Sequence, residues 1–197
     1  ICEPDAKLRD AAFKGVQQCL RTFMKGYPDD GGCEEGVSYW DCAGASFFES
    51  LYFMQFAPKQ AVLTLNEAQK KKVENMGRFI TTMYINDLTF VNFSDAQAQN
   101  VPNINILFPY GEFLQNEQMM QLAAYVGKKY QYSLKPSTLF LKSGNYPKLG
   151  RELMLLSMLP KYQATAAVEP KTEDAYLLNS QIMVASNKNW FVAAKGG

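Results

Sequence analysis

Apolar side chains recur every three or four residues between positions 4 and 159, which is the spacing of one face of an α-helix. This periodicity predicts helices over residues 4–26, 35–57, 116–130 and 147–159, and a further helix that begins at Asn66 and Glu67. A shorter helical piece is expected within residues 101–110. Helix pairs joined by short loops fit a bundle or part of an α/α toroid of about six helices.

The stripes also predict which faces are buried. In the first helix the expected core positions are Leu8, Ala12, Val16, Cys19, Leu20 and Phe23. In the helix over 147–159 they are Leu149, Leu153 and Leu156. Charge runs are usually solvated, so Lys70, Lys71 and Lys72 predict an exposed face.

The pattern changes after Pro160. Residues 169–174 resemble a linker, and residues 176–185 and 190–194 alternate like two strands with a hairpin loop between them. An isolated pair of strands is marginally stable in water, so these strands are expected to need further strands from outside this chain. We therefore divide the chain into a helical part, 1–163, and a linker with strands, 164–197. The chain begins at Ile1 and stops just after a strand-like run, so we expect a fragment of a longer protein.

Composition then excludes several functional classes. The sequence has no histidine, which excludes a Ser-His-Asp triad, a Cys-His dyad and a His-ligated zinc within it. Proton transfers by this chain would use Tyr, Lys, Asp, Glu or Cys. The net charge of +1 argues against a nucleic-acid binder. No apolar run approaches the roughly 18 residues that cross a bilayer, so no membrane partner is expected.

The four cysteines match no metal or redox spacing. Cys2, Cys19, Cys33 and Cys42 all lie in the first quarter of the chain. We interpret them as small buried hydrophobes, with disulfide bonds in an oxidising compartment as the alternative.

Residues 29–40 (DDGGCEEGVSYW) concentrate carboxylates, glycines and aromatic rings. If a helix has begun by Glu35, then Glu35 and Tyr39 are four residues apart on one face, and the carboxylate can orient the phenol. The alternative is an ordinary capping segment in which Tyr39 and Trp40 are core aromatics.

Three segments, in the same order, resemble the heparinase II/III-like polysaccharide lyases and alginate lyases. The first is the run within residues 29–40, the second is VNFSDA at 91–96, which resembles the family's NFADA stretch, and the third is FVAAKGG at 191–197. The resemblance covers nearly the whole chain, from about Asp5 to Gly197. It implies an incomplete helical toroid followed by β-sandwich layers that continue beyond this chain.

The resemblance also implies β-elimination of uronic-acid polysaccharides. In that reaction one group neutralises the C5 carboxylate, a base removes the C5 proton, and an acid protonates the departing glycosidic oxygen. Tyr39 matches the family's catalytic tyrosine, and Glu35 matches an acidic residue beside it. Many members have His after that tyrosine, where this sequence has Trp40, and the remaining catalytic groups would lie outside the chain. We therefore expect one catalytic side chain here and little or no activity in isolation.

Five residues are candidate substrate-binding positions: Asp30, Trp40, Asn92, Asp95 and Tyr110. Asp95 or Ser94 is alternatively a helix cap, and both aromatics are alternatively core residues. Tyr110 is expected to be exposed, because Pro109 and Gly111 favour a loop there.

The sequence thus favours a fragment of a periplasmic or secreted lyase whose partner is an acidic polysaccharide or oligosaccharide. A non-catalytic glycan-binding or structural helical domain is the alternative, as is a generic helical interaction module. No cofactor is expected within this chain, although a metal in the β-domain beyond it is compatible with the family.

Overall fold

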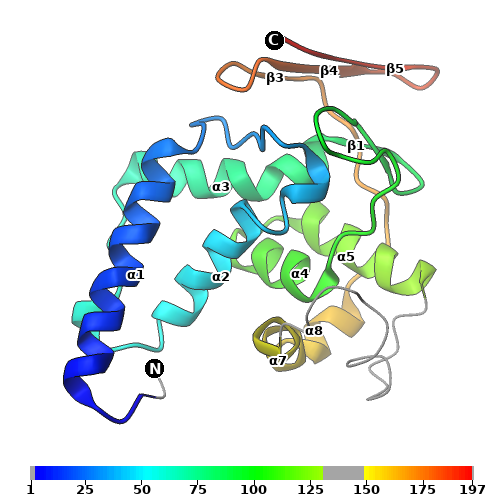
Figure 1. Cartoon of the computed structure of the whole chain (residues 1–197). Coiled ribbons are helices and arrows are strands. Elements are labelled where there is room, and N and C mark those ends of the chain that lie inside the picture. The colour runs from blue at the N-terminus through cyan, green and yellow to red at the C-terminus, as the bar shows by residue number, and fades with distance from the viewer. Residues whose placement is uncertain (1–2, 131–148, 197) are drawn as a thin grey trace.

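The computed structural model describes residues 3–130 and 149–196, and about half of these residues are helical (Figure 1). The α-helices are α1 (Ala6–Gly26), α2 (Gly44–Met54), α3 (Glu67–Thr82), α4 (Ile104–Phe113), α5 (Glu117–Lys129), α7 (Leu149–Ser157) and α8 (Leu159–Ala164). Two short 3₁₀ turns are η1 (Val37–Tyr39) and η2 (Lys59–Ala61). The expectation of a mainly α-helical chain is confirmed. None of the described helices is long and apolar enough to cross a membrane.

Local side-chain caps explain where several helices begin. The Asp5 carboxylate accepts hydrogen bonds from the backbone N–H groups of Lys7 and Leu8 at the start of α1. Asn66 and Gln69 form a reciprocal capping box at the start of α3, and Asn116 caps α5. Such caps satisfy backbone donors that have no partner inside the helix, so these starts were predictable from sequence.

The helix predicted over 35–57 is wrong in its first part. Gly36 has φ +91° and ψ −179°, a backbone conformation reserved for glycine, so no helix runs through it. The chain instead makes η1, turns, and starts α2 at Gly44. Glu35 and Tyr39 therefore do not share a helical face.

An aromatic stack forms the centre of the core. The rings of Trp40 and Tyr110 stack with centroids 6.1 Å apart, and Phe48 stacks on Tyr110 at 4.1 Å. Trp40 Nε1 donates to the Met76 carbonyl at 2.7 Å. Tyr110 lies inside α4 and is fully buried, so the prediction of an exposed loop there is wrong. Helix α4 continues through Pro109, because burying the Tyr110 ring in the core favours a helix here over the predicted loop.

The face that α7 buries is also opposite to the predicted one. Leu149, Leu153 and Leu156 are exposed, while Arg151, Met154 and Leu155 face the core. Arg151 is completely buried, and its Nε donates to Glu49 Oε2 at 2.8 Å. Its other guanidinium nitrogens donate to the Asp41 carboxylate and carbonyl and to Ser46 Oγ. These bonds join α7 to α2 and to the turn before it.

The lysine run at the start of α3 is solvated only in part. Lys70 and Lys71 are exposed, as predicted, but Lys72 is buried. Its ammonium donates to the carbonyls of Met24 and Tyr27 at the end of α1 and pairs with Asp29 at 2.6 Å. Lys72 thus neutralises the negative end of α1 and fixes that helix against α3.

Two small antiparallel sheets complete the described chain. Strands β1 (Tyr84–Asn86) and β2 (Thr89–Phe90) form a hairpin. Ser94 and Asp95 follow it in a turn rather than capping a helix, because Ser94 has φ +50°. The predicted capping role is therefore wrong.

The second sheet has the order β3 (Ala175–Leu177), β4 (Ile182–Ser186) and β5 (Phe191–Lys195). The strand predicted over 176–185 is two strands joined by a turn, and the predicted hairpin into the last strand is confirmed. Leu177, Ile182 and Val184 belong to the same buried cluster as the helices. The sheet therefore packs on the helical part through one face (Figure 1).

Candidate functional site

The three segments that carry the family resemblance meet in the folded chain. A Cβ atom added at Gly36 would lie 2.4 Å from the Ala96 Cβ and 2.8 Å from the Phe93 carbonyl oxygen, so the two loops touch at backbone distance. The backbone N–H of Gln97 donates to Ser38 Oγ at 3.0 Å. We call residues 35–39, residues 92–97 and Lys195 the motif surface.

The third segment reaches the motif surface through β5. The Lys195 ammonium lies 5.8 Å from the centre of the Phe93 ring, a cation–π distance. The loop at 92–97, which touches the glycine loop before η1, is thus joined to β5, about one hundred residues further along the chain. Residues that are far apart in sequence form one continuous surface.

Tyr39 ends η1 and is 40% exposed. Its hydroxyl makes no hydrogen bond to another described residue, which leaves it open to a ligand. Glu35 is exposed in the preceding turn, and no hydrogen bond joins its carboxylate to Tyr39 among the residues described. The structure therefore supports an accessible tyrosine and not the predicted carboxylate–phenol pair on a helix.

Asn92 and Asp95 are both exposed on the loop that contacts Gly36. Their positions are compatible with the predicted role in binding a substrate beside Tyr39. Both sit within a few residues of the Phe93 carbonyl that touches the glycine loop.

Trp40 and Tyr110 cannot stack on a sugar in this structure. Trp40 is 1% exposed, and Tyr110 has no exposed surface. Burial raises the pKa of the Tyr110 hydroxyl, which donates to the Val73 carbonyl at 2.6 Å. Their prediction as binding residues is corrected: both rings hold α2, α3 and α4 together.

Asp30 connects the glycine loop to the second sheet. Its carboxylate accepts from the Ser180 N–H at 2.8 Å, from Ser180 Oγ at 2.7 Å and from the Gly32 N–H at 3.0 Å. These bonds occupy both oxygens, so Asp30 orders the loop that precedes the motif surface.

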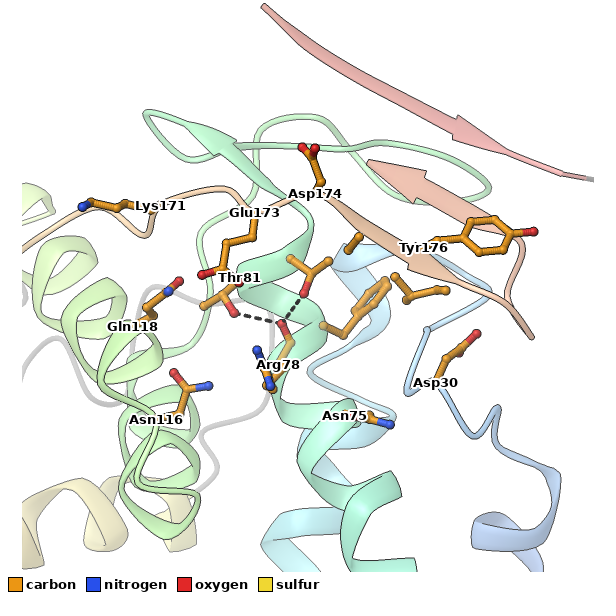
Figure 2. A pocket seen from close by; sticks show the side chains of 14 residues that line it. Asp30, Asn75, Arg78, Thr81, Asn116, Gln118, Lys171, Glu173, Asp174 and Tyr176 are labelled. Atoms are coloured by element: carbon orange, nitrogen blue, oxygen red, sulfur yellow. Dashed lines mark hydrogen bonds between the residues drawn. The ribbon is translucent and has the colours of Figure 1, made fainter. Parts of the chain in front are cut away.

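A polar cleft lies next to Asp30, between α3, the start of α5 and residues 171–177 (Figure 2). Its volume is about 340 Å³, enough for a sugar residue and its water. The labelled side chains that line it are Asp30, Asn75, Arg78, Thr81, Asn116, Gln118, Lys171, Glu173, Asp174 and Tyr176.

Sequence reasoning missed all of the cleft except Asp30. The lining residues come from segments up to about 150 residues apart, and each segment alone has the composition of a solvated helix face or linker. No local spacing could have brought them together.

Of the described cysteines, Cys33 alone fits the prediction of a small buried hydrophobe. Cys33 is buried, and burial raises the pKa of its thiol and also that of the neighbouring Tyr27 hydroxyl. Cys19 and Cys42 are exposed, and all three are free thiols, while Cys2 lies outside the described residues. Within residues 3–130 and 149–196 no group of three or more Cys, Asp or Glu side chains is placed to hold a metal ion.

Comparison with known protein families finds no match for this chain, and no curated protein matches it either.

Proposed function

We propose that this chain is part of a polysaccharide lyase of the heparinase II/III-like type, which cleaves uronic-acid glycans by β-elimination in the periplasm or outside the cell. One observation carries the proposal: the three segments that resemble this family lie together and leave Tyr39 exposed on their common surface. Three independent stretches of sequence would not need to meet if their resemblance were accidental.

In this proposal Tyr39 is the residue that exchanges a proton with the substrate. A phenol hydroxyl can act as a general acid, and Tyr39 would give its proton to the departing glycosidic oxygen. Asn92 and Asp95 would bind sugar hydroxyl groups beside it. The groups that neutralise the C5 carboxylate and remove the C5 proton are assigned to parts of the protein outside these residues.

The same proposal assigns the helices to an incomplete α/α toroid. Helix α2 packs on α3, and α4 packs on α5, so these helices form sequential pairs as in a toroid built from helix pairs. The apolar outer face of the second sheet, with Tyr176, Met183 and Val192 exposed, fits a first β-layer that further strands cover.

A non-catalytic glycan-binding domain is the second candidate. It is favoured by Trp40, which stands where many family members have His and is buried with its indole N–H bonded to a backbone carbonyl. A side chain locked in the core in this way transfers no proton to a substrate.

The test combines binding with turnover. Purified chain is titrated by calorimetry with a panel of uronic-acid tetrasaccharides and assayed for the ultraviolet absorbance of unsaturated uronate ends. We expect binding to at least one tetrasaccharide, a several-fold loss of affinity in Tyr39→Phe and no turnover. Binding that is unchanged in Tyr39→Phe would favour the non-catalytic candidate, and the absence of all binding would contradict both.

Turnover by this chain that disappears in Tyr39→Phe would keep the lyase assignment. It would contradict the statement that the remaining catalytic groups lie outside these residues.

A further inference from the structure

Some polar side chains that line the cleft already form hydrogen bonds within the protein, and the others are available to a ligand. Asp30 is bonded to Ser180 and Gly32, and the Asp174 carboxylate accepts from the Ser186 N–H at 2.9 Å. The hydroxyls of Thr81 and Thr82 donate to the Arg78 carbonyl, as the dashed lines in Figure 2 show. None of these groups needs a ligand.

The open groups are mainly hydrogen-bond donors. Among the described residues, the side chains of Lys171, Gln118 and Glu173 have no hydrogen-bonding or ionic partner. Asn116 uses its oxygen to cap α5 at the Met119 N–H, which leaves its NH₂ group available.

Arg78 is the strongest donor in the cleft and is only loosely held. The contact from Arg78 Nη1 to Glu74 Oε1 is 3.5 Å long, whereas Lys71 reaches Glu74 at 2.9 Å. The Lys71 bond is also the main reason that the pKa of Glu74 is lowered. Glu74 would therefore keep its closer partner, Lys71, if the Arg78 guanidinium turned to another acceptor.

The cleft thus offers Lys171, which has no ionic partner among the described residues, and Arg78, which is held only by its 3.5 Å contact with Glu74. Together with two amides and the Glu173 carboxylate, they match a ligand rich in acceptors that also carries hydroxyl groups. We infer that this cleft binds a carboxylate-bearing sugar residue, with Arg78 and Lys171 on the sugar carboxylate and Asn116, Gln118 and Glu173 on its hydroxyls. A guanidinium suits this role because its paired N–H groups match both oxygens of a carboxylate. The inference rests on the proposed function, because it assigns a second subsite to the same glycan.

The cleft subsite is separate from the motif surface. Neither Tyr39 nor Glu35, Asn92 or Asp95 lines the cleft. A glycan held in the cleft would thus contact α3 and α5 with one sugar residue. Binding in the cleft is expected to add affinity without supplying the chemistry.

The experiment measures binding of whichever uronic-acid tetrasaccharide the panel shows to be tightest. We expect Arg78→Ala to weaken it about tenfold, the usual effect of removing a hydrogen-bonded charge from a carboxylate. Arg78→Lys should weaken binding less, since lysine keeps the positive charge but lacks the paired N–H groups of the guanidinium. The matched control is Arg21→Ala on α1, where the side chain is exposed and unpaired among the described residues. Thermal unfolding of each variant checks that the fold is intact.

Two further measurements locate the bound sugar. The side-chain amide signals of Asn116 and Gln118 in a nitrogen–proton NMR spectrum should shift during the titration, and should shift less with the carboxyl-reduced, neutral tetrasaccharide. Uronic acid monomer should move the same signals at higher concentration, which separates a free sugar acid from a glycan as the occupant.

The outcomes distinguish this inference from the proposed function. Wild-type binding that Arg78→Ala leaves unchanged, with no shift of the two amide signals, would overturn the cleft subsite and leave the lyase proposal standing. Equal affinity for the acidic and the neutral tetrasaccharide would overturn the carboxylate assignment. Failure of the wild-type chain to bind any uronic-acid tetrasaccharide would overturn the proposed function, and the subsite with it.

Discussion

Single buried side chains carry much of the structural information that local patterns miss. Arg151 and Lys72 belong to residue types that are almost always exposed, yet both are buried here. Each can be buried because the folded chain surrounds its charge with hydrogen-bonding and ionic partners. Arg151 meets two carboxylates and a hydroxyl, and Lys72 meets two helix-end carbonyls and Asp29. A buried cation without such partners would be strongly destabilising.

Replacing Arg151 therefore has a predictable cost. Arg151→Met should lower the free energy of unfolding by about 3 kcal/mol, because it leaves the partly buried Glu49 carboxylate without its charge partner. Urea denaturation followed by circular dichroism measures the loss. Arg21→Met, at an exposed position, is the control and should change stability by less than about 0.5 kcal/mol. Equal stability of the two variants would show that the Arg151 network is not formed.

Elements were predictable where a local signal set their limits. The starts of α1, α3 and α5 follow from Asp5, Asn66 and Asn116, whose side chains cap the helices from their own sequence neighbourhood. The start of α2 was not predictable, because the break at Gly36 depends on its contact with a loop sixty residues later. The buried face of α7 was ambiguous for a similar reason: the helix has two apolar stripes, and distant carboxylates select the one with Arg151.

Two glycine substitutions test whether the backbone conformation at Gly36 prevents a helix there. Gly36→Ala should destabilise the protein by about 1–3 kcal/mol, because alanine is strained at φ +91° and its Cβ would meet Ala96. Gly15→Ala, within exposed α1 and with nothing within 4 Å, should instead stabilise it by up to about 1 kcal/mol. Thermal unfolding compares the two. The same sign for both substitutions would contradict the backbone conformation at Gly36.

At the scale of the whole molecule, long-range polar bonds position the second sheet on the helices. The Asp30 carboxylate binds the turn between β3 and β4, and Glu169 accepts hydrogen bonds from the Tyr84 hydroxyl and from the Asp87 N–H at 2.7 Å. The cleft is lined by α3, the start of α5 and residues 171–177, and the motif surface includes Lys195 of β5. The relative position of sheet and helices thus determines both candidate sites.

Removing the Asp30 connection should loosen the sheet without melting the helices. Asp30→Ala leaves the Ser180 N–H and hydroxyl unsatisfied, a cost of about 1–3 kcal/mol. Hydrogen exchange should then accelerate at the β4 and β5 amides and stay unchanged in α4 and α5. Asp10→Ala, on the exposed side of α1, is the matched control. Uniform acceleration throughout the chain would instead indicate that sheet and helices open as one unit.

The sequence by itself determined the helical class, three helix starts and the last hairpin, because caps and periodicity act between near neighbours. It also predicts a site at Tyr39 and the loops around it, through residues that are contiguous in the chain. Only the tertiary structure decided which rings are buried, as for Trp40 and Tyr110, and which cations are paired. It alone assembled the cleft around Arg78, because burial and charge pairing depend on segments that the chain brings together only when it folds.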